Sequence, residues 1–150
     1  MIRDDIKTAT ITAMKAKDSI RLGTLRLISA ALKNKDIELR TGVAPADDDV
    51  VVADVLSKMA KQRRESIDMF VTGGRPELAD AERAELGVIE GFMPTQMAAG
   101  EAQAAVRALV LELGATSVKD MGRVMTAVRE RFAGQLDMGS ASAMVKAALG

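Results

Sequence analysis

The amino-acid sequence predicts an all-α protein, with a four-helix N-terminal domain followed by a small three-helix C-terminal domain. Apolar residues recur every three or four positions through most of the chain, which is the period of an amphipathic helix. No run of β-branched residues alternates with polar residues for long enough to need a sheet. Ten methionines and many alanines suit a core built from closely packed pairs of helices.

The first two helices are predicted over residues 2–16 and 20–39. A stripe of apolar residues on the first faces the core: Ile2, Ile6, Ala9 and Ala13. The second presents a longer stripe: Leu22, Leu25, Ile28 and Leu32. Between the two helices, Asp18 or Ser19 can cap the second, and Gly42 is expected to end it.

The longest helix is predicted over residues 48–71. The three aspartates Asp47–Asp49 stand at its start, where a carboxylate caps free backbone amides and interacts favourably with the helix dipole. We favour this capping role over a metal site. Gly73 and Gly74 then break the chain, and Pro76 suits the first turn of a fourth helix that ends near Met93.

Arg63 has an unusual position on the helix over residues 48–71. It lies in the middle of the apolar face, between Met59 and Ile67. A guanidinium group in such a place is costly unless a carboxylate neutralises it. We therefore expect Arg63 to be largely buried, in a structural role, and paired with Glu82 or Glu85 of the fourth helix.

A domain boundary is predicted at Pro94, because proline disfavours helical conformation at the residue before it. The two domains are thus residues 1–94 and 95–150. The second contains three predicted helices, over residues 99–113, 118–131 and 140–149. A capping box of Ser117 and Asp120 opens the middle one, and Ser140 can cap the last.

Composition limits the chemistry that this chain can perform. Its 21 basic residues balance its 21 acidic ones, and it contains no Cys and no His. Thiol and imidazole nucleophiles, the commonest general base and the usual zinc ligands are therefore missing. We predict no catalytic residue, no metal and no cofactor. The N-terminus has no apolar signal region and the longest uncharged run is too short to span a bilayer, so a cytoplasmic location is expected.

The helix over residues 118–131 carries the best candidate for a binding face. Lys119 and Arg123 lie one helical turn apart on its outer side, and Gly122 beside them would let a ligand approach the backbone closely. Three further basic residues could extend this face into a patch for phosphates: Arg129, Arg131 and Lys146. The alternative is that Gly122 only makes room for the last helix and that the basic groups are ordinary surface.

Three stretches together resemble the GatB/YqeY family: Lys61–Ile67, Glu85–Pro94 and the capped helix with its following turn, Ser117–Gly139. That family comprises free-standing YqeY-type proteins. Its C-terminal part is similar to the tail of the GatB component of the glutamine-dependent aspartyl/glutamyl-tRNA amidotransferase. The resemblance implies that residues 95–150 form a tail-like domain that docks tRNA.

The resemblance therefore implies a tRNA-binding accessory protein, related to a carbon–nitrogen ligase that uses glutamine as amido-N donor. Lys119, Gly122 and Arg123 are the matching positions. Catalysis by this chain alone is not expected. The expected partners are tRNA and proteins that process aminoacyl-tRNA, with no DNA and no membrane, and the protein is expected to be a monomer. The alternative is a non-catalytic protein–protein adaptor that uses its helical faces.

Overall fold

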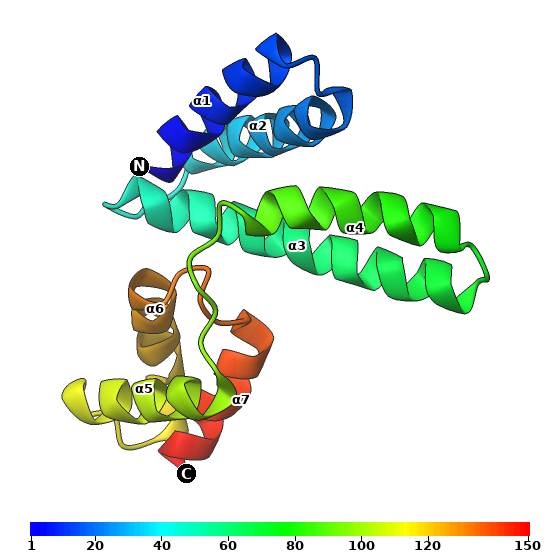
Figure 1. Cartoon of the computed structure of the whole chain (residues 1–150). Coiled ribbons are helices and arrows are strands. Elements are labelled where there is room, and N and C mark those ends of the chain that lie inside the picture. The colour runs from blue at the N-terminus through cyan, green and yellow to red at the C-terminus, as the bar shows by residue number, and fades with distance from the viewer. The chain divides into compact units, whose positions relative to one another are not determined.

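The computed structural model describes all 150 residues, which form seven α-helices and one short 3₁₀ helix (Figure 1). There is no strand, so the all-α prediction is confirmed. The chain divides into two compact units, Met1–Met93 and Pro94–Gly150, and each unit has its own apolar core. No helix is both long and apolar enough to cross a lipid bilayer.

The N-terminal unit contains four helices: α1 (Ile2–Lys15), α2 (Ser19–Leu39), α3 (Asp48–Thr72) and α4 (Pro76–Glu90). Helices α3 and α4 lie side by side, and α1 packs against both α2 and α3 (Figure 1). The largest fully buried side chains come from all four helices: Ile6, Leu25, Ile28, Leu56 and Ile89. Burying such a side chain contributes about 1.5–3 kcal/mol to stability, so this core is the main force that holds the helices together.

Aspartates begin two of these helices. The carboxylate of Asp18 accepts a hydrogen bond from the amide of Arg21, and that of Asp47 accepts one from the amide of Asp49. The expected capping role at the start of α3 is thus confirmed. Asp49 is used differently, because its carboxylate accepts a hydrogen bond from the amide of Ile2 and so ties the start of α1 to the start of α3.

Arg3 joins three helices at one corner of this unit. Its guanidinium donates to Asp48 at the start of α3, with bonds of 2.9 Å, and to Asp36 on α2, with bonds of 3.0 Å. These contacts hold the pKa of Asp48 below its ordinary value and raise the pKa of Arg3. The paired residues are far apart in sequence, and their contacts fix α1 against the other two helices.

Helix α4 ends at Glu90, three residues before the predicted end near Met93. The amides of Phe92 and Met93 bond to carbonyls three residues earlier, which is the pattern of a tight turn. Because Pro94 restricts the residue before it, the chain leaves the helix gradually instead of stopping at the proline.

The C-terminal unit contains α5 (Ala99–Glu112), the 3₁₀ helix η1 (Val118–Asp120), α6 (Met121–Arg131) and α7 (Met138–Leu149). Helix α7 packs against both α5 and α6. The centre of this core consists of fully buried valines and a leucine: Val106, Leu109, Val124, Val128 and Val145. On α5 and on α6 the buried residues recur three or four positions apart, which is the spacing of one face of a helix.

Two details of this unit differ from the sequence-based prediction. The segment over residues 118–131 begins as a 3₁₀ turn and becomes α-helical only at Met121. Helix α7 starts at Met138, two residues early, because Asp137 is the cap and its carboxylate accepts from the amide of Ser140 at 3.0 Å. Leu136 is buried and Met138 packs against the core, which sets the start of α7 before Ser140.

Candidate functional site

The predicted binding face lies where η1 meets α6. Lys119 is in η1, and Gly122 and Arg123 are in the first turn of α6. All three residues are exposed. The capping box expected at Ser117 and Asp120 is present. The face therefore exists as a surface, and what it can bind depends on whether its cations are available.

The guanidinium of Arg123 is engaged within the unit. It donates to the carbonyl oxygen of Leu113 at 2.8 Å and to the carboxylate of Asp120 at 3.3 Å. Leu113 follows the last residue of α5, where carbonyls have no partner inside the helix. Arg123 thus caps α5 and closes the loop that leads to η1, which is a structural role.

Asp120 is the centre of this loop. Its carboxylate accepts hydrogen bonds from the amides of Thr116 and Ser117, at 3.0 and 3.3 Å. These two bonds, together with the guanidinium of Arg123, hold the pKa of Asp120 below its ordinary value. The carboxylate is therefore charged at neutral pH and offsets the positive charge of Arg123. An approaching phosphate would meet an ion pair at this point.

Of the other predicted contact residues, one is paired within the unit and two are not. Arg131 forms a two-bond ion pair with Glu112 at the end of α5, which holds the pKa of Glu112 below its ordinary value. Arg129 and Lys146 are exposed, on α6 and α7, and neither forms an ion pair, nor does Lys119. Of the predicted patch, then, two cations are neutralised by the fold and three remain open to solvent.

Gly122 is not needed to make room for a neighbouring helix. Apart from its chain neighbours and the backbone of its own helix, a Cβ atom placed on it would meet no atom within 4 Å. The alternative explanation of Gly122, that it lets the last helix pack closely, is therefore wrong.

Replacing Gly122 by Ala is expected to stabilise the C-terminal unit, by about 0.5–1 kcal/mol, because glycine lowers helix stability and the site is open. The matched control is Gly114→Ala. Gly114 has the same open surroundings but a φ of +63°, which a residue with a Cβ adopts only at a cost. Chemical denaturation followed by circular dichroism measures both. A loss of stability in Gly122→Ala would show that Gly122 has a structural purpose after all.

Arg63 lies at the junction of α3 and α4. Its Nε donates to Glu85 at 2.7 Å and lies 3.6 Å from a carboxylate oxygen of Glu82. The arginine side chain is only 16% exposed. The guanidinium thus serves as the counter-charge of two carboxylates inside the unit, which suits a structural role.

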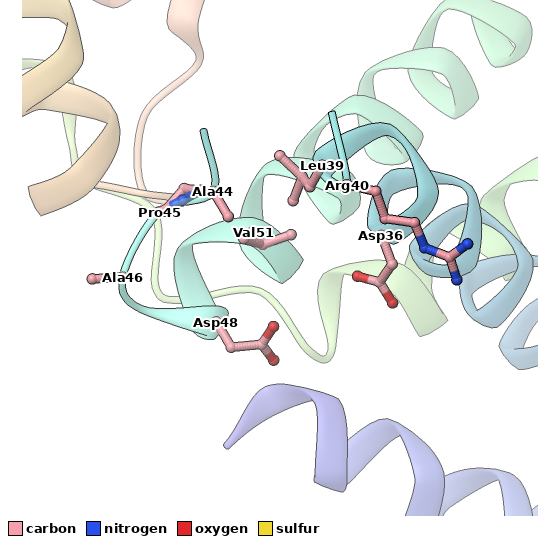
Figure 2. A pocket seen from close by; sticks show the side chains of 8 residues that line it. All are labelled: Asp36, Leu39, Arg40, Ala44, Pro45, Ala46, Asp48 and Val51. Atoms are coloured by element: carbon pink, nitrogen blue, oxygen red, sulfur yellow. The ribbon is translucent and has the colours of Figure 1, made fainter. Parts of the chain in front are cut away.

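A depression of about 300 Å³ lies between the end of α2, the following loop and the start of α3 (Figure 2). It is lined by both polar and apolar residues: Asp36, Leu39, Arg40, Ala44, Pro45, Ala46, Asp48 and Val51. No local sequence pattern predicts it, because it forms only when α2 and α3 pack together. Its two carboxylates are already bound by Arg3, so Arg40 is its one unpaired charged group.

The fold and these surfaces define a class of protein: two helical units whose polar clusters are largely satisfied by internal ion pairs and helix caps. The chain belongs to the YqeY-like family. The family described as Yqey-like protein matches residues 3–149.

Its relatives include proteins named altered inheritance of mitochondria protein 41, mitochondrial. The one from Eremothecium gossypii is 36% identical over 107 residues, which cover 71% of this chain and 55% of that protein. The one from Lachancea thermotolerans is 32% identical over 114 residues, which cover 75% and 57%. The chain thus spans a little over half the length of these relatives.

These findings overturn the prediction of a tRNA-binding accessory of an amidotransferase. The relatives are named for the inheritance of mitochondria, and nothing in those names refers to tRNA or to a carbon–nitrogen ligase. The structure supplies a physical reason, because Arg123 and Arg131, two of the six predicted contact residues, direct their charge to contacts within the unit. A shared helical scaffold does not imply a shared ligand.

The prediction of a cytoplasmic location is also wrong. The relatives carry the word mitochondrial in their names. The prediction depended on the missing apolar region of a secretory signal, and import into mitochondria uses amphipathic, arginine-rich segments instead. A missing secretory signal therefore has no bearing on this compartment.

Proposed function

We propose that this chain is a non-catalytic adaptor that binds other proteins through the outer faces of its helices. The observation that carries the proposal is the exposure of large apolar side chains on helices of both units. Ile20 on α2 is 70% exposed, and Leu111 on α5 is 82% exposed. Burial of one such side chain in a complex contributes about 1.5–3 kcal/mol, so a few of them can support a stable interface.

The polar side chains are consistent with this function. The ion pairs of Arg3, Arg63 and Arg131 each join different helices of one unit and hold those helices in place. The structure brings together no group of three or more acidic side chains that could hold a metal ion. The names of the relatives point to mitochondria as the first compartment in which to look for the partner.

Site-specific photo-crosslinking in living cells tests the proposal. A photoreactive residue replaces Leu111 or Met69, which are exposed apolar residues of different units, or Lys61, which is an exposed polar control. We expect at least one apolar position to capture one defined protein in a yield well above that of Lys61, and nuclease treatment should not change the product. Capture of RNA alone, or no protein above the control, would contradict an adaptor function.

A further inference from the structure

The outer face of α2 has a regular sequence pattern that the core of the unit does not use. Ile20, Leu27 and Asn34 recur every seven residues, and a second series begins three residues after the first: Gly23, Ala30 and Ile37. Together these six residues form a continuous line along the helix, which we call the α2 seam. At 1.5 Å per residue, the seam is about 27 Å long.

The α2 seam is open to solvent along its length. Ile20, Leu27 and Ile37 are 70%, 46% and 48% exposed, and the other three residues of the seam are also exposed. The core-facing residues of α2 form a separate stripe on another side of the helix: Thr24, Leu25, Ile28 and Leu32. Helix α2 therefore has two apolar faces, and only one of them is covered within the unit.

Cations line one edge of the seam. Arg26, Lys33 and Arg40 are again seven residues apart, and all three are exposed. None of them forms an ion pair within the chain. Asp36, one helical turn before Arg40, is bound by Arg3, and Glu38 is the partner of Lys35. These three residues, the cationic edge, present unpaired positive charge beside an unpartnered apolar line.

The pattern is that of one strand of a coiled coil. Ile20, Leu27 and Asn34 take the a positions, the second series takes the d positions, and the cationic edge takes the g positions. A polar Asn at a single a position sets register in such pairs, and charges at g pair with charges on the facing helix. Gly23 is consistent with close approach, because a Cβ there would meet nothing within 4 Å of its own fold.

We propose that α2 docks one amphipathic helix of a partner protein, whose carboxylates recur every seven residues and face the cationic edge. The proposal depends on the adaptor function and specifies its surface and the chemistry of its partner. Charge complementarity selects this occupant, since three unpaired cations at a fixed spacing are matched by three acidic groups at the same spacing.

A second copy of this chain does not supply carboxylates opposite the cationic edge. In an antiparallel pair of α2 helices, the cationic edge of one copy would face that of the other, and like charges repel. In a parallel pair, the cations would have to reach the e positions, which are Thr24, Ala31 and Glu38. Thr24 is buried and Ala31 is half-buried in the unit, and only Glu38 offers a carboxylate.

Binding of a synthetic helix tests the proposal directly. The probe is a fluorescent 21-residue peptide with Leu at a, Ala at d and Glu at e and g, whose repulsion between glutamates disfavours self-pairing. We expect it to bind the full chain in a salt-dependent manner. The triple variant Arg26→Glu/Lys33→Glu/Arg40→Glu should bind about tenfold more weakly or worse, because three attractive pairs become repulsive. A peptide with Lys in place of Glu should bind the triple variant and not the wild type.

The control variant Lys15→Glu/Lys61→Glu/Lys146→Glu changes the net charge equally at exposed positions outside the seam, and its affinity should stay within about twofold of wild type. Circular dichroism checks that both variants fold. An equal loss in the control, no binding by the wild type, or no rescue by the Lys peptide overturns the proposal. Binding of the wild type to anionic phosphatidylglycerol vesicles but not to the peptide would also overturn the proposal. Self-association of the chain through the seam would overturn it as well.

Crosslinking in cells separates this proposal from the adaptor function. A photoreactive residue at Leu27 should capture a protein, and the triple variant should abolish that capture. Capture through Leu111 or Met69 that the triple variant leaves unchanged, with none through Leu27, would overturn docking on α2 and leave the adaptor function standing. No captured protein at any position would remove both.

Discussion

Replacing Arg63 by Ala is expected to lower the free energy of unfolding of the N-terminal unit by about 3 kcal/mol. Arg63 is largely buried and its Nε lies 2.7 Å from Glu85. Glu82 depends on it as well, because one of its carboxylate oxygens is buried and accepts no hydrogen bond, with the Nε of Arg63 at 3.6 Å. Removal of the guanidinium would leave two half-buried carboxylates next to each other without a counter-charge.

The neighbouring residue supplies a matched control. Arg64 also pairs with a carboxylate of α4, Glu90 at 2.8 Å, but both side chains are about half exposed. Exposed pairs of this kind contribute about 0–1 kcal/mol, so Arg64→Ala should change stability little. Urea denaturation of both variants measures the difference. Equal midpoints would mean that the cluster around Arg63 contributes no more than a surface ion pair.

Replacing Leu56 by Ala is expected to cost about 3–4 kcal/mol, which makes it the other large effect in this protein. Leu56 is on α3, is fully buried and belongs to the core formed with α1, α2 and α4. The substitution removes apolar contacts and leaves a cavity that the surrounding helices can only partly close. The loss should appear as reduced protection against hydrogen exchange at amides of α1 to α4.

Leu27→Ala makes the same chemical change on the exposed seam of α2. Leu27 is 46% exposed and outside the core, so its truncation should change stability by less than about 1 kcal/mol. Hydrogen exchange of the two variants, read helix by helix, provides the comparison. A loss at Leu27 as large as the loss at Leu56 would show that the seam is already covered within the chain.

Local features of the sequence were enough to predict the helices. The apolar period, the cap at Asp47 and the capping box at Ser117 involve residues within four positions of each other, and the structure has them where the sequence places them. The position of Arg63 was equally informative. A charge on the centre line of an apolar stripe must meet a counter-charge, and the structure places it against Glu85 and Glu82.

The candidate site depended on contacts that no local pattern reveals. Arg123 bonds to a carbonyl ten residues away, and Arg131 pairs with a glutamate nineteen residues away. Both residues look like free surface cations in the sequence. The heptad spacing along α2 was visible in the sequence, but the sequence alone did not show that Ile20, Leu27 and Ile37 stay uncovered by the other helices.

By itself, the sequence determined the all-α class, the helix faces and most of the helix ends, because these follow from the period of the backbone and from caps within one turn. The tertiary structure alone decided which cations stay unpaired and which apolar face of α2 stays open. Those properties depend on how the chain brings distant helices together: Arg3 of α1 pairs with Asp36, which lies one helical turn before Arg40 on α2, and Arg40 forms no ion pair. Only the charged and apolar groups that the fold leaves unpaired or uncovered are available to bind a partner.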